Sequence, residues 1–182
     1  MKDMFRDCSN LKTIVFGGNF DTSKVTDMSN MFNGCSKLAT LDLSEFNTSI
    51  VTAMQGMFSG CSKLATLDLS EFKTSKVQNM SEMFRGCSGL TLLDLGKFST
   101  SMLGNMNSMF KDCLKLISLD LSEFNTSKIN ADYYMLSVFT NCSKLTRVRI
   151  NVENSNIKEL LEQLAGGWTY DTVERAYKRT VE

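Results

Sequence analysis

Aspartate residues recur in this chain every 26 residues, each between two leucines: Leu41-Asp42-Leu43, Leu67-Asp68-Leu69, Leu93-Asp94-Leu95 and Leu119-Asp120-Leu121. Successive side chains of a β-strand point to opposite faces, so inward leucines place the aspartates outward. A row of carboxylates can bind a partner or a weakly held cation. It can also be a solvated relic of repeat duplication. These three interpretations remain open at the level of sequence.

Two further positions belong to the same predicted strand face. The residue two places before each aspartate also points outward, and the last repeat carries arginines at both outward positions. We therefore predict a partner-binding strand face that consists of Asp42, Asp68, Asp94, Asp120, Thr40, Thr66, Arg147 and Arg149.

Cysteines also recur once per repeat, and none forms a C-x-x-C motif: Cys8, Cys35, Cys61, Cys87, Cys113 and Cys142. Zinc ribbons and thioredoxin-like motifs are therefore unsupported. Stacked repeats would bring successive cysteines within about 5 Å. We expect a ladder of buried, reduced thiols. Disulfides between neighbouring repeats and a redox or metal role remain as alternatives.

Other classes of chemistry are disfavoured by composition. The chain has no histidine, which removes histidine triads, histidine bases and histidine metal sites. The 20 basic and 20 acidic residues argue against a general nucleic-acid surface. No apolar run approaches the ~18 residues of a membrane span, so we expect no direct membrane insertion. We predict a protein that is not an enzyme and needs no cofactor.

The elements that must position these residues follow from the repeat itself. Blocks such as 31–38, 57–64 and 83–90 are near-duplicates, and self-similarity at this period predicts a solenoid. Leu38, Leu41 and Leu43 have leucine-rich-repeat spacing, which predicts a short strand at about residues 40–44. Met54, Met57 and Phe58 have the spacing of a helical turn. The predicted fold is an α/β solenoid, a leucine-rich-repeat-like right-handed coil with one short parallel strand and one short helix per repeat.

A stop signal precedes every cysteine. The residue at this position is always glycine, aspartate or asparagine: Asp7, Gly34, Gly60, Gly86, Asp112 and Asn141. These residue types tolerate a left-handed backbone, so we predict a positive φ there. The recurring phenylalanines and methionines predict a stacked core, and the recurring Thr-Ser pairs predict hydrogen bonds within and between turns.

We expect two parts. Residues 1–152 form about six repeats, and the array is incomplete at its N-terminus because Met4-Phe5 already occupies the Met-Phe position. Residues 153–182 form a C-terminal cap and tail. Ile157, Leu160, Leu161 and Leu164 predict an amphipathic helix at about 156–165, ended by Gly166-Gly167. The conformation of residues 168–182 is left open.

The pattern M-F-x-G-C-S-x-L-x-x-L-D-L-S-x-F-N-T-S-x-V-x-x-M, complete from Met31 to Met54, closely resembles BspA-like leucine-rich-repeat surface proteins of bacteria. The resemblance spans roughly residues 4 to 150. It implies a cell-surface or extracellular location and a role in adhesion to host matrix or to other cells. It brings no catalytic residues.

The sequence therefore leaves two candidate functions. The first is a non-enzymatic interaction or adhesion module that binds a protein partner, such as host matrix or another cell-surface protein, through its strand face. The second is a structural stalk of repeats that displays another domain and has no ligand of its own.

Overall fold

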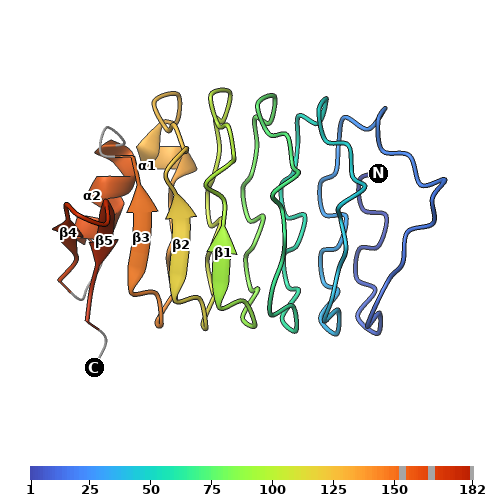
Figure 1. Cartoon of the computed structure of the whole chain (residues 1–182), viewed down its shortest axis with the longest axis horizontal. Helices are drawn as coiled ribbons and strands as arrows, with labels where there is room; N and C mark the ends of the chain where they lie inside the picture. Colours follow the sequence, from blue (N-terminus) through green and yellow to red (C-terminus); the bar gives the residue numbers. More distant parts are fainter. Residues whose placement is uncertain (152–154, 164–166, 181–182) are drawn as a thin grey trace.

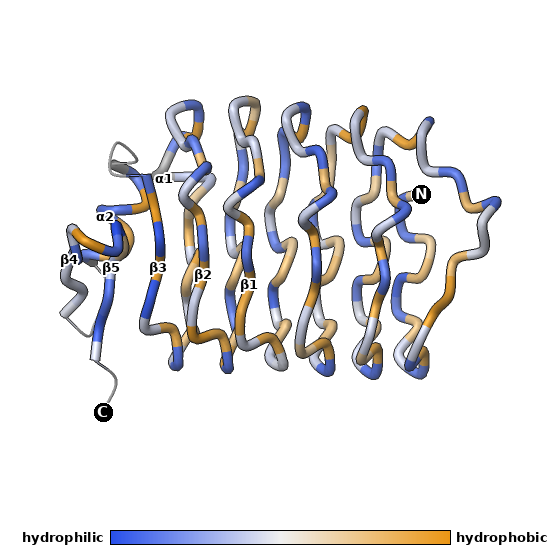
Figure 2. Tube along the Cα trace, in the orientation of Figure 1, coloured by the Kyte–Doolittle hydropathy of each residue, from blue (hydrophilic) through white to orange (hydrophobic). Residues whose placement is uncertain are grey.

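Repeat units lie side by side along the long axis of the molecule in the computed structural model (Figure 1). The structure describes residues 1–151, 155–163 and 167–180. Backbone hydrogen bonds join neighbouring units: the Phe32 N–H donates to the Met57 carbonyl at 2.9 Å, and the Gly34 N–H donates to the Ser59 carbonyl at 2.8 Å. The same apolar and polar positions recur from unit to unit (Figure 2).

The regular strands are gathered at the C-terminal end of the molecule, in one five-stranded sheet of order β1-β2-β3-β5-β4. Its strands are β1 (Leu92–Asp94), β2 (Ser118–Leu121), β3 (Arg147–Ile150), β4 (Thr169–Asp171) and β5 (Ala176–Lys178). β1, β2 and β3 pair in parallel, whereas β5 pairs antiparallel with both β3 and β4. The sheet is therefore mixed, and the prediction of a single parallel sheet is wrong.

The predicted α/β solenoid with one strand and one helix per repeat is also wrong. Most residues of the described units lie in turns or irregular backbone, and parallel strands form only at β1, β2 and β3. The helices among the described residues are α1 (Ala131–Tyr134), which lies at the three-residue insertion, and α2 (Ser155–Gln163) in the tail. No described helix is long and apolar enough to cross a membrane.

Left-handed residues explain why no helix forms at Met54, Met57 and Phe58. Gly56 has φ +61° and Gly60 has φ +75°, so the chain leaves the right-handed region twice within five residues. The N–H groups of Gly56, Phe58 and Gly60 consequently donate to carbonyls of the next unit. In an α-helix these groups would bond within the segment. Consecutive turns thus reproduce the i, i+3, i+4 side-chain spacing of a helix.

The predicted left-handed stops are confirmed. Gly34, Gly60 and Gly86 have φ values of +75°, +75° and +69°. The non-glycine members of this set, Asp7, Asp112 and Asn141, also have positive φ, at 59°, 64° and 62°. A second left-handed position lies four residues earlier in each unit and was not predicted: Asp3, Asn30, Gly56, Glu82, Ser108 and Ser137.

The core consists of ladders of side chains that run from unit to unit, as predicted. Phe58 stacks between Phe32 and Phe84 with ring centroids 5.8 Å away on both sides. Met54 and Met57 beside it are fully buried. Such packing supplies both apolar burial and favourable ring contacts. Each unit therefore depends on its neighbours for its core.

Buried threonines provide a second kind of ladder. The Thr48 hydroxyl donates to the Lys73 carbonyl at 3.2 Å and accepts from the Lys73 N–H at 2.7 Å. Thr22 and Thr100 make the same pair of bonds to Asn47 and Asn125. The predicted hydrogen-bonding role of the Thr-Ser pairs is thus confirmed for these threonines.

The tail departs from the predicted helical cap. α2 lies where a helix is predicted, and its Ile157 and Leu161 side chains are buried. The hairpin of β4 and β5 adds two antiparallel strands, so the last unit is covered by sheet as well as helix. The predicted helix end at residues 164–166 and the predicted domain boundary between 152 and 153 lie outside the described residues.

Candidate functional site

The predicted aspartate row lies on the surface. Asp42, Asp68 and Asp94 are exposed, and Asp120 is half-buried. Asp94 in β1 is the register partner of Asp120 in β2, and Asp120 is the partner of Arg149 in β3. The structure therefore brings Asp94, Asp120 and Arg149 together on one sheet, and the acidic row ends in an arginine.

Each carboxylate of the row is held by its own turn. Oδ1 of Asp42 accepts the Ser44 N–H at 3.0 Å, and Oδ1 of Asp68 accepts the Ser70 N–H at 2.9 Å. Asp94 and Asp120 accept in the same way from the residue two places on. The backbone bond, then the serine side chain, lowers the pKa of Asp42 and of Asp68. Local bonds therefore orient all four carboxylates, and they favour the ionised form of Asp42 and Asp68.

The two arginines of β3 are engaged in ion pairs. Arg149 Nη1 lies 3.3 Å from Asp120 Oδ2. Arg147 Nη2 lies 3.0 Å from Glu174 Oε2, which comes from the turn between β4 and β5. Arg147 occupies the register position of Ser118, so it lies beside the aspartate row. Both arginines thus tie the last repeat to its neighbours.

Thr40 and Thr66 are exposed, but their units do not join the sheet. Within the described chain, no backbone hydrogen bond links residues 41–44 to residues 67–70. A crevice of about 60 Å³ lies here between the two units, and Leu41, Asp42, Asp68 and Glu71 are among its lining residues. The predicted face is therefore a regular sheet only in its later units.

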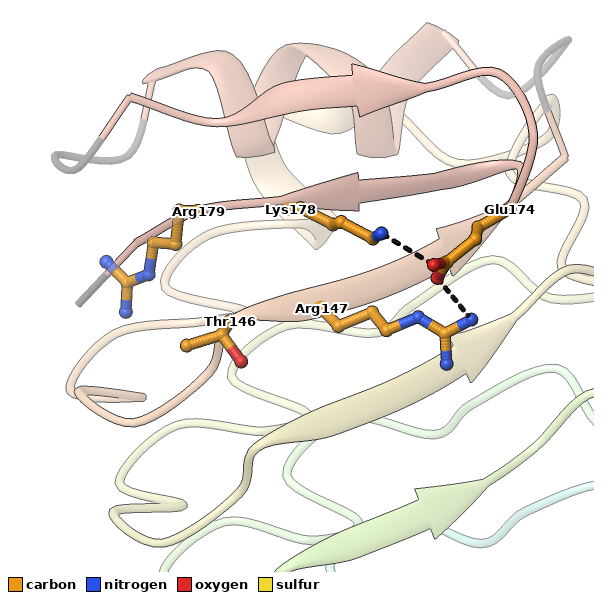
Figure 3. Close-up of a pocket in the computed structure, with 5 residues that line it drawn as sticks. All are labelled: Thr146, Arg147, Glu174, Lys178 and Arg179. Carbon is orange, nitrogen blue, oxygen red and sulfur yellow. Dashed lines mark ion pairs between the residues drawn. The ribbon is translucent and has the colours of Figure 1, made fainter.

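A charged pocket at the C-terminal end was not predicted. It has a volume of about 640 Å³ and is lined by Thr146, Arg147, Glu174, Lys178 and Arg179. Figure 3 shows Glu174 between Lys178 and Arg147, with Nζ of Lys178 2.7 Å from Glu174 Oε1. Glu174 and Lys178 are close in sequence, but only the antiparallel pairing of β5 with β3 brings Arg147 beside them. Sequence reasoning had no signal for that pairing.

Most of the charged side chains around this pocket form ion pairs with one another. Lys178 also lies 2.9 Å from Asp171, and the pKa of Asp171 falls to about 2 because its carboxylate accepts the Glu174 N–H and pairs with Lys178. Lys178 lowers the pKa of Glu174 in turn. The Arg179 Nε–H donates to the Leu145 carbonyl at 2.6 Å, so this guanidinium clamps the last turn of the repeats. The pocket is thus chiefly a structural junction.

Five of the six cysteines are buried, and all six are free thiols. The Cys61 thiol donates to the Phe32 carbonyl at 3.2 Å, and the Cys87 thiol donates to the Phe58 carbonyl at 3.0 Å. Burial raises the pKa of Cys61 to about 12. Such thiols are poor nucleophiles near neutral pH because the thiolate is the reactive form. The predicted burial is wrong for Cys8, which is exposed in the first unit.

The described residues contain no group of three or more histidine, cysteine, aspartate or glutamate side chains arranged to hold a metal ion. The cation-site interpretation of the aspartate row gains no support from this geometry. The surface instead offers oriented carboxylates that can accept hydrogen bonds and attract positive charge.

Comparison with known proteins gives one family. The family model described as "Mycoplasma protein of unknown function, DUF285" matches residues 1–92 and again residues 92–167. The search of curated proteins finds no match to this chain.

Proposed function

The chain belongs to the DUF285 family, and from this premise we propose that it is a non-enzymatic protein-interaction or adhesion module of a bacterial cell-surface protein. The family is found in BspA-like surface repeat proteins, which supports a surface location. More specifically, we propose that the chain is related to the BspA-like leucine-rich-repeat surface proteins, because its 26-residue pattern resembles theirs.

One observation carries the proposed binding role. Equivalent aspartates of successive units all reach the surface, and each Oδ1 is occupied by a turn N–H. Of the four aspartates of the row, only Asp120 uses its Oδ2 in an ion pair with a described residue, and that residue is Arg149. The outer oxygens of Asp42, Asp68 and Asp94 therefore remain for a partner. A basic segment on host matrix or on another cell-surface protein would complement this row.

The test removes charge from the row without removing the turn bonds. Asp68→Asn with Asp94→Asn keeps a side-chain oxygen that can accept the N–H of residue i+2. We expect binding to a panel of matrix proteins and whole cells to weaken and to lose part of its salt dependence. Binding that stays unchanged in the double variant would contradict a role for the row.

A matched control is available elsewhere in the chain. Asp21 and Asp27 accept the N–H groups of Ser23 and Ser29 in the same kind of turn, but they lie outside the aspartate row. Asp21→Asn with Asp27→Asn makes an identical change of charge. We expect this control to bind like the unaltered chain.

A structural stalk is the second candidate, and one observation favours it. The local bond to Oδ1 accounts for an aspartate in every turn even without a partner. A stalk predicts that the unaltered chain binds none of the matrix proteins or cells in the panel. It also predicts that replacing Asp68 with alanine reduces stability, because alanine cannot accept the Ser70 N–H.

A further inference from the structure

A second pocket lies between the last repeat and the tail, and its volume is about 310 Å³. We call it the Trp168 pocket. Among the described residues, its lining is apolar at Phe139, Leu145 and Trp168 and polar at Thr140, Asn141 and Ser143. Sites for small molecules measure about 300–1,000 Å³ and combine apolar walls with a few polar groups. The Trp168 pocket therefore has the size and the mixed lining of a site for a small ligand.

Arg179 holds the tail in place at this pocket. Its Nε–H donates to the Leu145 carbonyl at 2.6 Å, and its Nη2 donates to the Cys142 carbonyl at 3.0 Å. The same guanidinium lies 5.2 Å from the centre of the Trp168 ring, which is the geometry of a cation–π contact. Trp168 is also packed in the hydrophobic core. The pocket is thus a space between two packed segments, and the indole ring on its wall is fixed.

A hydrogen-bond donor on the wall of the pocket lacks an acceptor. Trp168 is only 9% exposed, and its buried indole Nε1–H makes no hydrogen bond with any described residue. Buried indole N–H groups usually have a partner, because a buried donor without an acceptor is unfavourable. An oxygen atom of a ligand in the pocket would supply that acceptor.

The lining restricts the chemistry of the ligand. Phe139 and Leu145 favour an apolar surface, whereas the Trp168 N–H requires an oxygen acceptor. The hydroxyl groups of Thr140 and Ser143 can both donate and accept. No acidic residue belongs to the described lining, so the pocket does not select a cation. A sugar ring meets these demands, because it has an apolar C–H face and hydroxyl groups around its rim.

From these observations we propose that the Trp168 pocket binds a single neutral sugar ring, either a free sugar or the terminal residue of a glycan. The C–H face packs on Phe139 and Leu145, and one sugar oxygen accepts the indole N–H of Trp168. A neutral ligand is favoured over an anion because backbone carbonyls already occupy Nε and Nη2 of Arg179. This site goes beyond the proposed protein interaction and uses no residue of the aspartate row.

The experiment follows the indole N–H directly by NMR of the full chain labelled with ¹⁵N. Trp168 is the only tryptophan in the sequence, so its indole gives a single signal. The probes are the methyl glycosides of glucose, galactose, mannose and N-acetylglucosamine, which imitate the end of a glycan, and the corresponding reducing sugars. Cyclohexanol is the control for a ring with one hydroxyl group, and benzoate is the control for a carboxylate. We expect a sugar to shift the indole signal saturably and to bind at least about tenfold more tightly than either control.

Variants test whether the pocket is responsible. Trp168→Phe keeps an aromatic ring but removes the donor, and calorimetry should show binding about tenfold weaker. Thr140→Val removes a half-buried hydroxyl group and keeps the indole signal as a reporter, so it decides the matter even if Trp168→Phe does not fold. We expect Thr140→Val to weaken binding by about threefold to tenfold. Thr172→Val is the matched control, because Thr172 is exposed in the turn between β4 and β5 and does not line the pocket.

Three results would overturn the proposal. These are an indole signal that no sugar of the panel shifts, equal affinity for cyclohexanol or benzoate, and equal weakening by Thr172→Val and Thr140→Val. Two results would support it and separate the sources of the sugar. Binding of the reducing sugars alone would indicate a free sugar, whereas binding of the methyl glycosides would indicate the end of a glycan. The proposed function is tested separately, since none of these outcomes depends on the aspartate row.

Discussion

The two halves of the repeat region share one sequence pattern and differ in their sheet. Residues 1–91 hold the same ladders of buried phenylalanine, methionine and cysteine as residues 92–150. Yet β1, β2 and β3 all lie in the second half, and residues 41–44 and 67–70 are separated by a crevice of about 60 Å³. The repeat pattern thus suffices for the core but not for strand pairing.

The difference follows from what lies beside each half. The tail places β5 against β3, and the ion pairs of Arg147 with Glu174 and Arg149 with Asp120 cross the strands there. No described strand lies beside the first half in this way. Like charge on neighbouring aspartates is common to both halves, because Asp42 slightly raises the pKa of Asp68 in the first half and Asp94 is the register partner of Asp120 in the second. Strand pairing is therefore strongest near the tail.

The prediction with the largest expected effect tests whether the cores of the two halves are equally well packed. Phe58→Ala in the first half and Phe110→Ala in the second each remove a fully buried, stacked ring. Each should lower the free energy of unfolding by about 3–5 kcal/mol. Chemical denaturation measures both. A much smaller loss for Phe58→Ala would mean that the first half lacks a rigid core.

The threonine ladder should matter equally in both halves. Thr48→Val and Thr100→Val each leave a backbone N–H, that of Lys73 or of Asn125, without its acceptor. The expected loss is about 1–3 kcal/mol in either case. Thr66→Val, at an exposed position, is the control and should change stability by less than about 0.5 kcal/mol.

A turn residue provides the next test. Gly60→Val places a β-branched residue at φ +75°, which should cost roughly 1–2 kcal/mol or more. Gly17→Val is the control, because an added Cβ at Gly17 meets nothing within 4 Å. If both variants had the same midpoint of unfolding, the left-handed turn would not limit stability.

A smaller effect on stability is expected from removing the ion pair between β2 and β3. Arg149→Gln removes the contact with Asp120, and exposed pairs of this kind contribute about 0.2–1 kcal/mol. Hydrogen exchange should become faster in β2 and β3 and should stay unchanged at residues 41–44. An equal increase in exchange rate in β2 and β3 and at residues 41–44 would contradict the difference in strand pairing between the two halves.

Lowering the pH should destabilise the tail modestly before it destabilises the rest of the chain. The pKa values of Asp171 and Glu174 are lowered in the folded chain, to about 2 for Asp171. Their stabilising effect is therefore complete above the unfolded pKa values of about 4 and is lost as the pH falls towards 2. Trp168 is the only tryptophan in the sequence, and its fluorescence should follow this loss. Glu174→Gln should flatten the pH dependence.

Much of the molecule was predictable because it depends on local residue types. The stops at Gly34, Gly60 and Gly86, the stacked phenylalanines and the outward aspartates are all visible in the spacing of the chain. The absence of a helix at Met54, Met57 and Phe58 was not predictable from the sequence. The i, i+3, i+4 spacing shows which side chains are buried, but it does not show to which carbonyls the backbone N–H groups donate. Glu82 and Ser108 gave no signal of a second left-handed position.

The sequence by itself determined the repeat length, the residues of the core and the left-handed stop before each cysteine, because these depend on side-chain size and on backbone preferences within one unit. Only the tertiary structure decided where strands form and how the tail packs on the last repeat. Those features depend on hydrogen bonds between distant segments, such as those between β3 and β5.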